Sequence, residues 1–168
     1  LALGGNSGNP IFDWFIGREL NPRIGEFDIK TFNELRPGLI LWALLDISCV
    51  CHQYTKFGWV SDSIVLVTLF HIWYIADSLI NESTILTQMD ITTDGFGFML
   101  SVGDLAWLPF TYCLQARFLA FHPIHLGWFG VLAILAVQFT GYYIFRVANL
   151  EKNEFRHGRN PKGTYIMR

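Results

Sequence analysis

The stretch of residues 89–118 limits most strongly what this chain can fold into. It begins as an acidic loop with Asp90 and Asp94 and continues into an apolar segment, residues 95–117, of the kind that crosses a membrane. Asp104 lies inside the apolar segment, where an acidic side chain is costly and usually marks a functional position. We therefore expect an integral membrane protein with a polar site inside a helix bundle.

Two residues in the same segment predict that its helix is irregular. Gly103 and Pro109 both weaken a continuous helix. Within a membrane such an interruption is tolerated only where neighbouring helices or a cavity satisfy the freed backbone groups. We therefore expect a helix that bends or breaks between these two positions.

The composition agrees with a membrane protein. Of the 168 residues, 52% are hydrophobic and 16% aromatic, and the apolar residues are concentrated in long runs. The net charge of −2 gives no basic patch for nucleic acid. The fold class that follows is an all-α, polytopic transmembrane helix bundle. Its four expected spans are residues 38–54, 61–80, 95–117 and 126–147.

The charged residues divide the chain into three parts. Residues 1–37 are predicted to be a cytosolic loop with a short interfacial segment, and 26–36 within them form an amphipathic helix or a surface loop. Residues 38–147 hold the four spans, and 148–168 form a basic cytosolic tail. Lysine and arginine are concentrated on the side that holds both ends, which the positive-inside rule places in the cytosol. The tail has no closing element, so we expect an internal part of a longer protein whose C-terminal half carries further cofactor-binding residues.

A polar stripe marks the second span. Its members recur every three to four residues and therefore share one helix face: His71, Tyr74, Asp77 or Ser78, and Asn81. In a bilayer this face should look into the bundle or a wet cavity. The pattern fits either a hydrogen-bonded packing seam between helices or a functional site. Glu82 extends the polar cluster to the membrane edge.

Three other patterns carry less information. Asp46 is a lone acid in the first span, and we interpret it as paired with a neighbouring span or close to the surface. The two histidines of His122-Pro-Ile-His125 could form a metal pair, although interfacial residues explain them as well. A dinucleotide fingerprint starting at Gly95-x-Gly97 fails, because no third glycine or alanine stands at residue 100 and no strand–helix unit surrounds it.

Lys152 and Arg156 are four residues apart, on one face of a helix that continues from the fourth span. A cationic pair at a cytosolic helix end suits phosphate groups, which arginine can bind with two parallel hydrogen bonds. Anchoring at the membrane surface explains the pair equally well.

Three segments together resemble one protein family. They are GNPIFDWFIGRELNPRIGEFDIKTFNELRPG (8–38), MDITTDGFGFMLSVGDLAWLPFTYCLQARFLAFHP (89–123) and GYYIFRVANLEKNEFRHG (141–158). The chain is similar in them to the sterol reductase family, which contains the sterol C-14 and C-7 reductases and the reductase-like domain of the lamin B receptor. The MDITTDGFGFML form resembles the C-14 branch and the lamin B receptor. The opening and the ISCVCHQY region resemble the fungal C-14 (delta-14) members.

The resemblance implies a protein of roughly ten spans in the endoplasmic reticulum membrane, or also in the nuclear envelope. It implies that NADPH reduces the C14=C15 double bond of a sterol, by protonation and then hydride transfer. The lysine and arginine of the family's K-N-x-F-R pattern contact the cofactor and correspond to Lys152 and Arg156. The tyrosine of its Y-x-x-D helix lies near the nicotinamide and corresponds to Tyr74. The family's GWW and R-H-x-N-Y-x-G-D segments do not occur in this chain, so we expect the chain alone to be inactive.

The resulting set of predicted site residues has three groups. Catalytic roles fall to Tyr74, Asp77 and Glu82, cofactor contacts to Lys152 and Arg156, and substrate contacts to Asp90, Asp94, Phe96 and Trp107. No metal is expected. The expected partners are a sterol from the bilayer, membrane lipid and other enzymes of the sterol pathway. Alternatives are a C-7-type reductase, a non-catalytic nuclear-envelope tether, and a transporter or receptor that uses the polar stripe as a ligand path.

Overall fold

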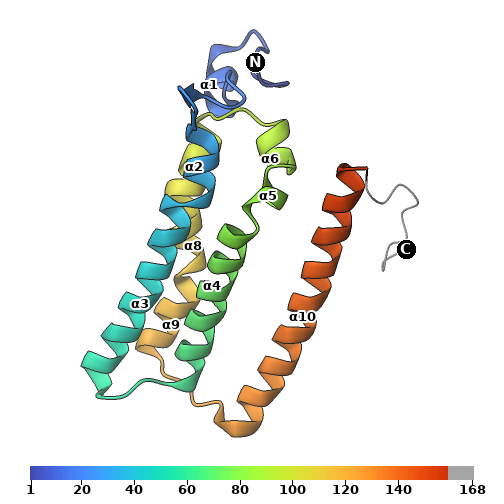
Figure 1. The fold of residues 1–168 in the computed structure, drawn as a ribbon. Coiled ribbons are helices and arrows are strands. Elements are labelled where there is room, and N and C mark those ends of the chain that lie inside the picture. Colours follow the sequence, from blue (N-terminus) through green and yellow to red (C-terminus); the bar gives the residue numbers. More distant parts are fainter. Residues whose placement is uncertain (159–168) are drawn as a thin grey trace. The chain divides into compact units, whose positions relative to one another are not determined.

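The computed structural model describes residues 1–158 and divides the chain into two units, Leu1–His125 and Leu126–Arg168. The first unit begins with α1 (Pro10–Ile16), a hairpin of β1 (Arg23–Ile24) and β2 (Phe27–Asp28), α2 (Ile29–Leu35), α3 (Pro37–Phe57) and α4 (Asp62–Ile80). It continues with α5 (Glu82–Ile85), α6 (Met89–Thr92), α7 (Phe98–Val102), the π-helix η1 (Gly103–Trp107), α8 (Leu108–Tyr112) and α9 (Leu114–Phe121). The described part of the second unit is α10 (Gly127–Arg156). The predicted all-α class is confirmed (Figure 1).

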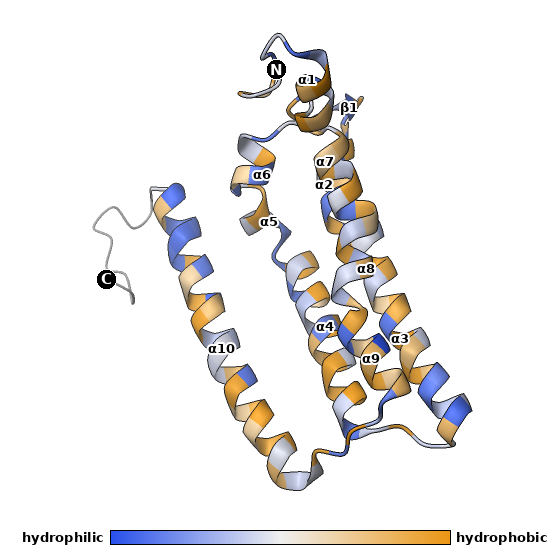
Figure 2. Cartoon of the chain, turned by 180° about the vertical axis from the view of Figure 1, so that it is seen from behind, coloured by the Kyte–Doolittle hydropathy of each residue, from blue (hydrophilic) through white to orange (hydrophobic). Residues whose placement is uncertain are grey.

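Within residues 1–158, three helical runs are long and apolar enough to cross a membrane. They are Ile29–Phe57, which joins α2 and α3, then α4, and α10. Figure 2 shows their mostly hydrophobic colouring. Pro37 begins α3, and its missing N–H costs no hydrogen bond because the first N–H groups of a helix have no partner within it. The helix ends at Gly58, whose φ of +77° is the left-handed conformation that glycine adopts easily.

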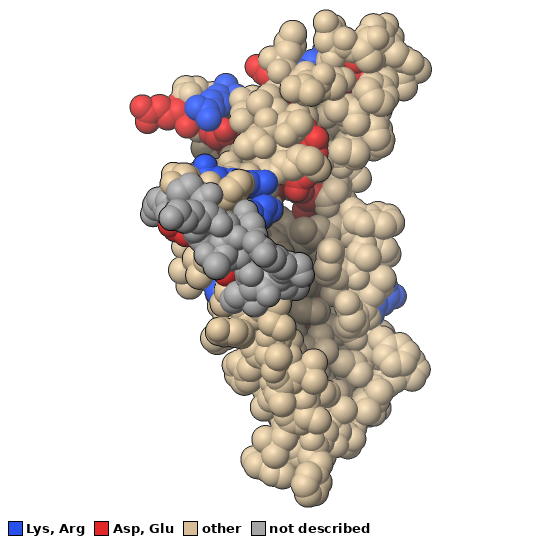
Figure 3. All heavy atoms as spheres, turned by 90° about the vertical axis from the view of Figure 1, so that its right-hand side faces the viewer, with Lys and Arg blue, Asp and Glu red and all other residues tan. Residues whose placement is uncertain are grey.

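These runs correspond to three of the four expected spans. Figure 3 shows a largely uncharged surface along the helices on the face drawn. The region 26–36 is not a separate surface element, because α2 continues directly into α3. The residues of the predicted tail from 159 to 168, which include the cations Arg159, Lys162 and Arg168, lie outside the described residues.

The third expected span, residues 95–117, is helical but interrupted. It starts at Phe98 and runs through α7, η1, α8 and α9 to Phe121. The π-helix begins at Gly103, and Pro109 occupies the first turn of α8. The predicted interruption between these two residues is therefore confirmed. This segment is not among the three continuous runs, so four spans and the sidedness derived from them stay predictions.

The centre of the first unit is α3, which packs against α4, α8 and α9 (Figure 1). Its core cluster comprises Leu39, Trp42, Ile75 and Cys113. At the start of α3 the backbone approaches η1 closely: a Cβ added to Gly38 would lie 1.9 Å from the carbonyl oxygen of Asp104. Only glycine allows this contact, so the first turn of α3 and the π-helix can approach each other backbone to backbone.

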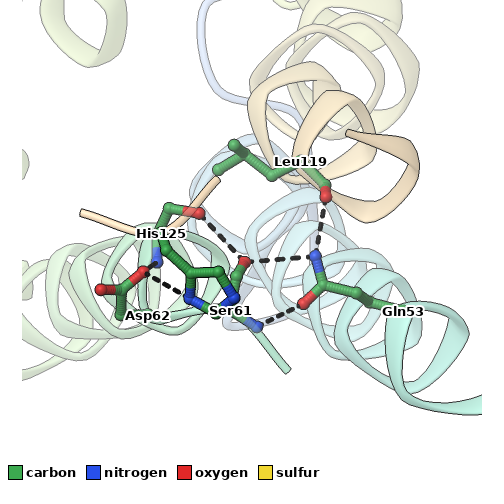
Figure 4. A network of polar contacts seen from close by, with 6 residues as sticks. Gln53, Ser61, Asp62, Leu119 and His125 are labelled. Atoms are coloured by element: carbon green, nitrogen blue, oxygen red, sulfur yellow. Dashed lines mark hydrogen bonds and ion pairs between the residues drawn. The ribbon is translucent and has the colours of Figure 1, made fainter. Parts of the chain in front are cut away.

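A polar network fixes the opposite end of the same helices (Figure 4). The buried amide of Gln53 donates to the carbonyl oxygen of Leu119 at 2.8 Å and to the hydroxyl of Ser61 at 3.2 Å. The backbone N–H of Ser61 donates back to Gln53 at 2.7 Å. Nearby, His125 Nδ1 lies 3.9 Å from Asp62 Oδ1. The network joins the end of α3, the beginning of α4 and the end of α9.

Glycine-to-glycine contact holds α1 against the segment that precedes α7. A Cβ added to Gly95 would lie 2.0 Å from the carbonyl oxygen of Gly17, and one on Gly97 would lie 2.3 Å from the Gly17 nitrogen. The backbone N–H of Phe96, between the two, donates to the carbonyl of Glu19 at 2.9 Å. This contact gives Gly95-x-Gly97 a structural purpose that replaces the rejected dinucleotide fingerprint.

We predict that Gly95→Ala in the full-length protein weakens the docking of α1 by about 1–3 kcal/mol, because the added methyl group forces two backbones apart. Gly103→Ala is the matched control, since a Cβ there meets nothing within 4 Å and neither glycine has a positive φ. The measurement is the melting temperature in detergent together with the rate of protease cleavage ahead of α2. Equal melting temperatures and cleavage rates for the two variants would contradict the prediction.

Candidate functional site

Trp42 lies at the centre of an aromatic cluster between α3, α4 and α8. Its ring centroid is 4.6 Å from that of His71, 5.9 Å from that of Tyr74 and 5.1 Å from that of Tyr112. Only 4% of Trp42 is exposed. The sequence reasoning missed Trp42 and Tyr112. A signal was available for the tryptophan, because it lies four residues before Asp46 and therefore shares its helix face.

Asp46 is paired with a neighbouring helix, which was one of the two alternatives left open by the sequence. Its side chain is fully buried, and Oδ2 lies 2.6 Å from Nδ1 of His71 on α4. The indole N–H of Trp42 points to the same nitrogen at 3.2 Å. The acid in α3 and the first residue of the polar stripe thus form one contact across the α3–α4 interface.

The rest of the stripe is on one side of α4 but is not uniformly buried. Tyr74 is 48% exposed, and its backbone carbonyl accepts from the hydroxyl of Ser78. The amide of Asn81 donates to Asp77 Oδ1 at 3.0 Å and to the carbonyl of Asp77 at 2.9 Å. His71 therefore belongs to a packing seam, and Tyr74 is half exposed; a functional role of the stripe stays a prediction.

Glu82 forms an ion pair that the sequence did not indicate. Both of its carboxylate oxygens accept from the guanidinium of Arg36, at 2.9 and 3.3 Å. Arg36 lies between α2 and α3, so the pair joins that junction to the start of α5. Two parallel hydrogen bonds fix the orientation of a carboxylate. The catalytic role predicted for Glu82 would thus fall to a carboxylate that is already bound to a cation.

A buried lysine holds the segment 89–94, in which Asp90 belongs to α6 and Asp94 follows that helix. Lys30 of α2 is fully buried, and its ammonium donates to the carbonyl oxygens of Asp94 at 2.5 Å and Ile91 at 3.3 Å. The carboxylates of Glu34, Asp94 and Asp90 lie near this ammonium group and interact with its positive charge. The two predicted substrate contacts therefore lie in a segment held by Lys30. Of the two alternatives for residues 26–36, an amphipathic helix and a surface loop, the structure has the helix as α2, and Lys30 lies on its buried side.

A cavity of about 690 Å³ lies between α1 and the start of α7. Trp14, Arg18, Phe96 and Ser101 are among the residues that line it. Phe96 is thus at a cavity wall, whereas Trp107 is 65% exposed on η1 and does not belong to the lining. The structure therefore does not bring these two predicted substrate contacts together.

One acid that lines this cavity has a perturbed pKa. The side-chain hydroxyl and the backbone N–H of Ser7 both donate to Asp13 Oδ1, at 2.7 and 2.8 Å. These hydrogen bonds, the hydroxyl's first, hold the pKa of Asp13 below its ordinary value. Asp13 is therefore a stable carboxylate at neutral pH, and it fastens the N-terminal loop to α1.

The cationic pair of the C-terminal region lies on α10, within the second unit. Lys152 and Arg156 are in its last two turns, four residues apart, and both are exposed. The predicted continuation of the helix beyond residue 147 is confirmed. Exposed cations one turn apart can hold phosphate oxygens, so these residues fit the phosphate groups of a dinucleotide.

The two histidines at the end of the third helical region have separate partners. The ring of His122 stacks on Phe118 with centroids 4.7 Å apart. The ring of His125 stacks on Trp59 at 4.6 Å and faces Asp62. These contacts favour the interfacial interpretation over a shared metal.

Together these observations define a class of protein: a polytopic helical membrane protein with a buried acid–histidine pair beside a half-open tyrosine and a cationic pair at the end of an apolar helix. The chain belongs to the ergosterol biosynthesis ERG4/ERG24 family, whose profile matches residues 1–168.

Individual relatives agree with the family match. The chain is 67% identical over 164 residues to the Delta(14)-sterol reductase erg24 of Schizosaccharomyces pombe, covering 96% of the chain and 39% of the relative. It is 59% identical over 159 residues to the Delta(14)-sterol reductase ERG24 of Saccharomyces cerevisiae, covering 95% of the chain and 36% of the relative. The Candida albicans Delta(14)-sterol reductase ERG24 is 56% identical over 163 residues, with coverages of 96% and 36%. The chain thus spans less than two fifths of the length of these relatives.

We predict that Lys30→Met destabilises the full-length protein by about 3 kcal/mol, because it leaves two buried carbonyls and nearby carboxylates without their cation. The control is Lys56→Met, since Lys56 is exposed and its ammonium only lies over the rings of Phe57 and Phe121. Thermal unfolding and hydrogen exchange of residues 89–94 measure the effect. Unchanged hydrogen exchange of residues 89–94 in Lys30→Met would show that Lys30 does not hold this segment.

Proposed function

We propose that the full-length protein containing this chain reduces the C14=C15 double bond of a sterol intermediate, with NADPH as reductant, in sterol biosynthesis. The observation that carries the proposal is the 67% identity, over 96% of the chain, to a relative named Delta(14)-sterol reductase. The matched region includes the polar stripe of α4 and the cationic end of α10. The names of these relatives favour the C-14 position over a C-7-type specificity.

The chemistry of the substrate defines what the site must provide. An isolated alkene accepts hydride poorly, so the double bond must first be protonated, at C15, to give a tertiary cation at C14. Hydride addition at C14 then completes the reduction, and bound NADPH would supply this hydride. The protein must therefore provide an acid, groups that stabilise a cation, and an environment that excludes water.

Tyr74 is the proposed proton donor. Its phenol is half open and belongs to the cluster around Trp42, together with Tyr112. Aromatic faces of this kind can stabilise a positive charge nearby. Asp77 lies one turn further along α4, where its carboxyl could tune Tyr74, stabilise the cation or donate the proton itself. Glu82, bound to Arg36, would act on the same region from the end of the helix.

The remaining predicted residues have supporting roles in this proposal. Lys152 and Arg156 would hold phosphate groups of NADPH. The sterol would enter laterally from the bilayer of the endoplasmic reticulum, the proposed location of the protein. The proposed substrate contacts remain Asp90, Asp94, Phe96 and Trp107. Asp90 and Asp94 belong to the segment held by Lys30, and Phe96 lines the cavity beside α1.

The first test is a sterol profile. Cells lacking C-14 reductase accumulate delta-14 sterols, and the full-length gene should remove them. Tyr74→Phe or Asp77→Asn should lower turnover about a hundredfold at normal expression, since an acid–base contribution is lost. Tyr54→Phe is the control, because Tyr54 is an exposed tyrosine on the neighbouring helix α3. Full activity of both site variants would refute their roles, and no rescue by the wild-type gene would refute the reaction in favour of a C-7-type enzyme or a membrane tether.

A second test addresses the reductant. Lys152→Gln and Arg156→Gln should each raise the KM for NADPH about tenfold or more, the loss expected for one charge-assisted hydrogen bond. They should also reduce the rise in melting temperature that NADPH causes. Arg146→Gln, earlier on α10, is the matched loss of charge and should leave both quantities unchanged. Identical behaviour of all three variants would assign the pair to membrane anchoring alone.

A further inference from the structure

The helix α1 buries its acid and exposes its apolar side chains. Asp13 is 4% exposed, whereas Ile11 is 75%, Phe12 47% and Trp14 59% exposed. In water this arrangement is unfavourable, because apolar surface stays in contact with solvent. At a membrane surface it is favourable, since the apolar side chains of such a helix enter the boundary between lipid headgroups and acyl chains. The exposed side of α1 therefore fits a lipid surface.

The position of α1 in the first unit agrees with a membrane boundary. It packs against α7, which begins the third expected span at Phe98, and it lies at one end of the long helices (Figures 1 and 2). The ring of Trp14 stacks on that of Phe98, with centroids 4.6 Å apart. Tryptophan is enriched at the level of the headgroups. We therefore expect the cavity between α1 and α7 at this level.

The lining of this cavity carries charges of both signs. Arg18 contributes a guanidinium, and Asp13 and Glu19 contribute carboxylates. Arg18 donates to Asn6 Oδ1 at 3.4 Å, which uses one of the five N–H donors of a guanidinium. The other donors can bind a phosphate through two parallel hydrogen bonds. The two carboxylates repel a ligand that is only anionic and attract one that also carries an ammonium group.

The remainder of the lining is largely aromatic. Trp14, Phe96 and Phe98 form this part of the wall. The faces of aromatic rings attract ammonium groups, including methylated ones. The volume of about 690 Å³ lies within the range of sites for small ligands, about 300–1,000 Å³. The cavity thus combines a group for phosphate, groups for a cation and an apolar wall.

We propose that this cavity binds the headgroup of a zwitterionic phospholipid from the surrounding bilayer. The phosphate lies on Arg18, and the ammonium group lies between Glu19 and the aromatic wall. The exposed apolar side chains of α1 contact the acyl chains beside it. The bound lipid holds α1 at the membrane surface. The proposal does not depend on sterol reduction, and of the proposed site residues only Phe96 lines the cavity.

Lipid binding to the purified full-length protein tests this proposal. The delipidated protein in detergent is titrated with phosphatidylcholine or with phosphatidylglycerol, which has the phosphate but no ammonium group. Native mass spectrometry counts the lipid molecules bound. We expect one phosphatidylcholine to bind in a saturable step, about tenfold more tightly than phosphatidylglycerol, since the ammonium group adds a charge-assisted contact.

Three variants assign the binding to the cavity. Arg18→Gln should weaken phosphatidylcholine binding about tenfold, because a charge-assisted hydrogen bond to the phosphate is lost. Glu19→Gln should largely remove the preference over phosphatidylglycerol, because a carboxylate that repels the anionic lipid is gone. Arg23→Gln is the matched control: it removes the same charge from β1, outside the lining, and should bind both lipids as the wild type does.

Four results would overturn the proposal. Equal affinity of the wild type for the two lipids would remove the ammonium contact, and unchanged binding by Arg18→Gln would remove the phosphate contact. Equal weakening by Arg18→Gln and Arg23→Gln would indicate attraction to the protein's overall charge. A lower melting temperature of Arg18→Gln than of Arg23→Gln in the absence of lipid would assign Arg18 to folding.

Discussion

Buried polar side chains on the run Ile29–Phe57 determine how the other helices of the first unit are arranged. Lys30, Asp46 and Gln53 are all fully buried, at three levels of this run. A polar group without water must find a partner in the protein, and each of these finds it in a different segment. Lys30 binds the loop after α6, Asp46 binds α4, and Gln53 binds the start of α4 and the end of α9. Apolar contacts alone would tolerate sliding of one helix along another, whereas these hydrogen bonds fix the register.

Much of the fold could be predicted from the sequence because long apolar runs, glycine and proline act locally. The helices at 37–57, 62–80 and 127–156 and the interruption at Gly103 follow from such signals. Partners could not be predicted, because a pattern shows which residues share a helix face but not what that face contacts. Pairing of Asp46 was one of two expected possibilities. Its partner His71, the Arg36–Glu82 pair and the burial of Lys30 depend on segments 25 to 64 residues away.

The candidate site shows the same division. The stripe from His71 to Asn81 was visible as a spacing, and the structure places its members on one side of α4. The cluster around Trp42 was not predicted as a whole: its spacing to Asp46 marks Trp42, but Tyr112 on α8 resembles any other aromatic residue of an apolar helix. Phe96 and Trp107, both predicted as aromatic substrate contacts, differ in environment because Phe96 precedes α7 and Trp107 belongs to the π-helix. Chemical type alone did not distinguish a cavity wall from an exposed ring.

The π-helix η1 contains one residue more in its turn than an α-helix would need. Deleting a single residue between 103 and 107 could therefore be absorbed by conversion to an α-helix, without breaking the chain's path. The deletion and the conversion nearly cancel in angle, because about five residues of a π-helix and about four of an α-helix each complete roughly one turn. Tyr112 would therefore still face Trp42. The same deletion inside a regular α-helix would rotate everything beyond it by about 100° and separate the two rings. The π-turn thus lets this segment lose one residue while α8 and α9 keep the side chains that they present to the rest of the bundle.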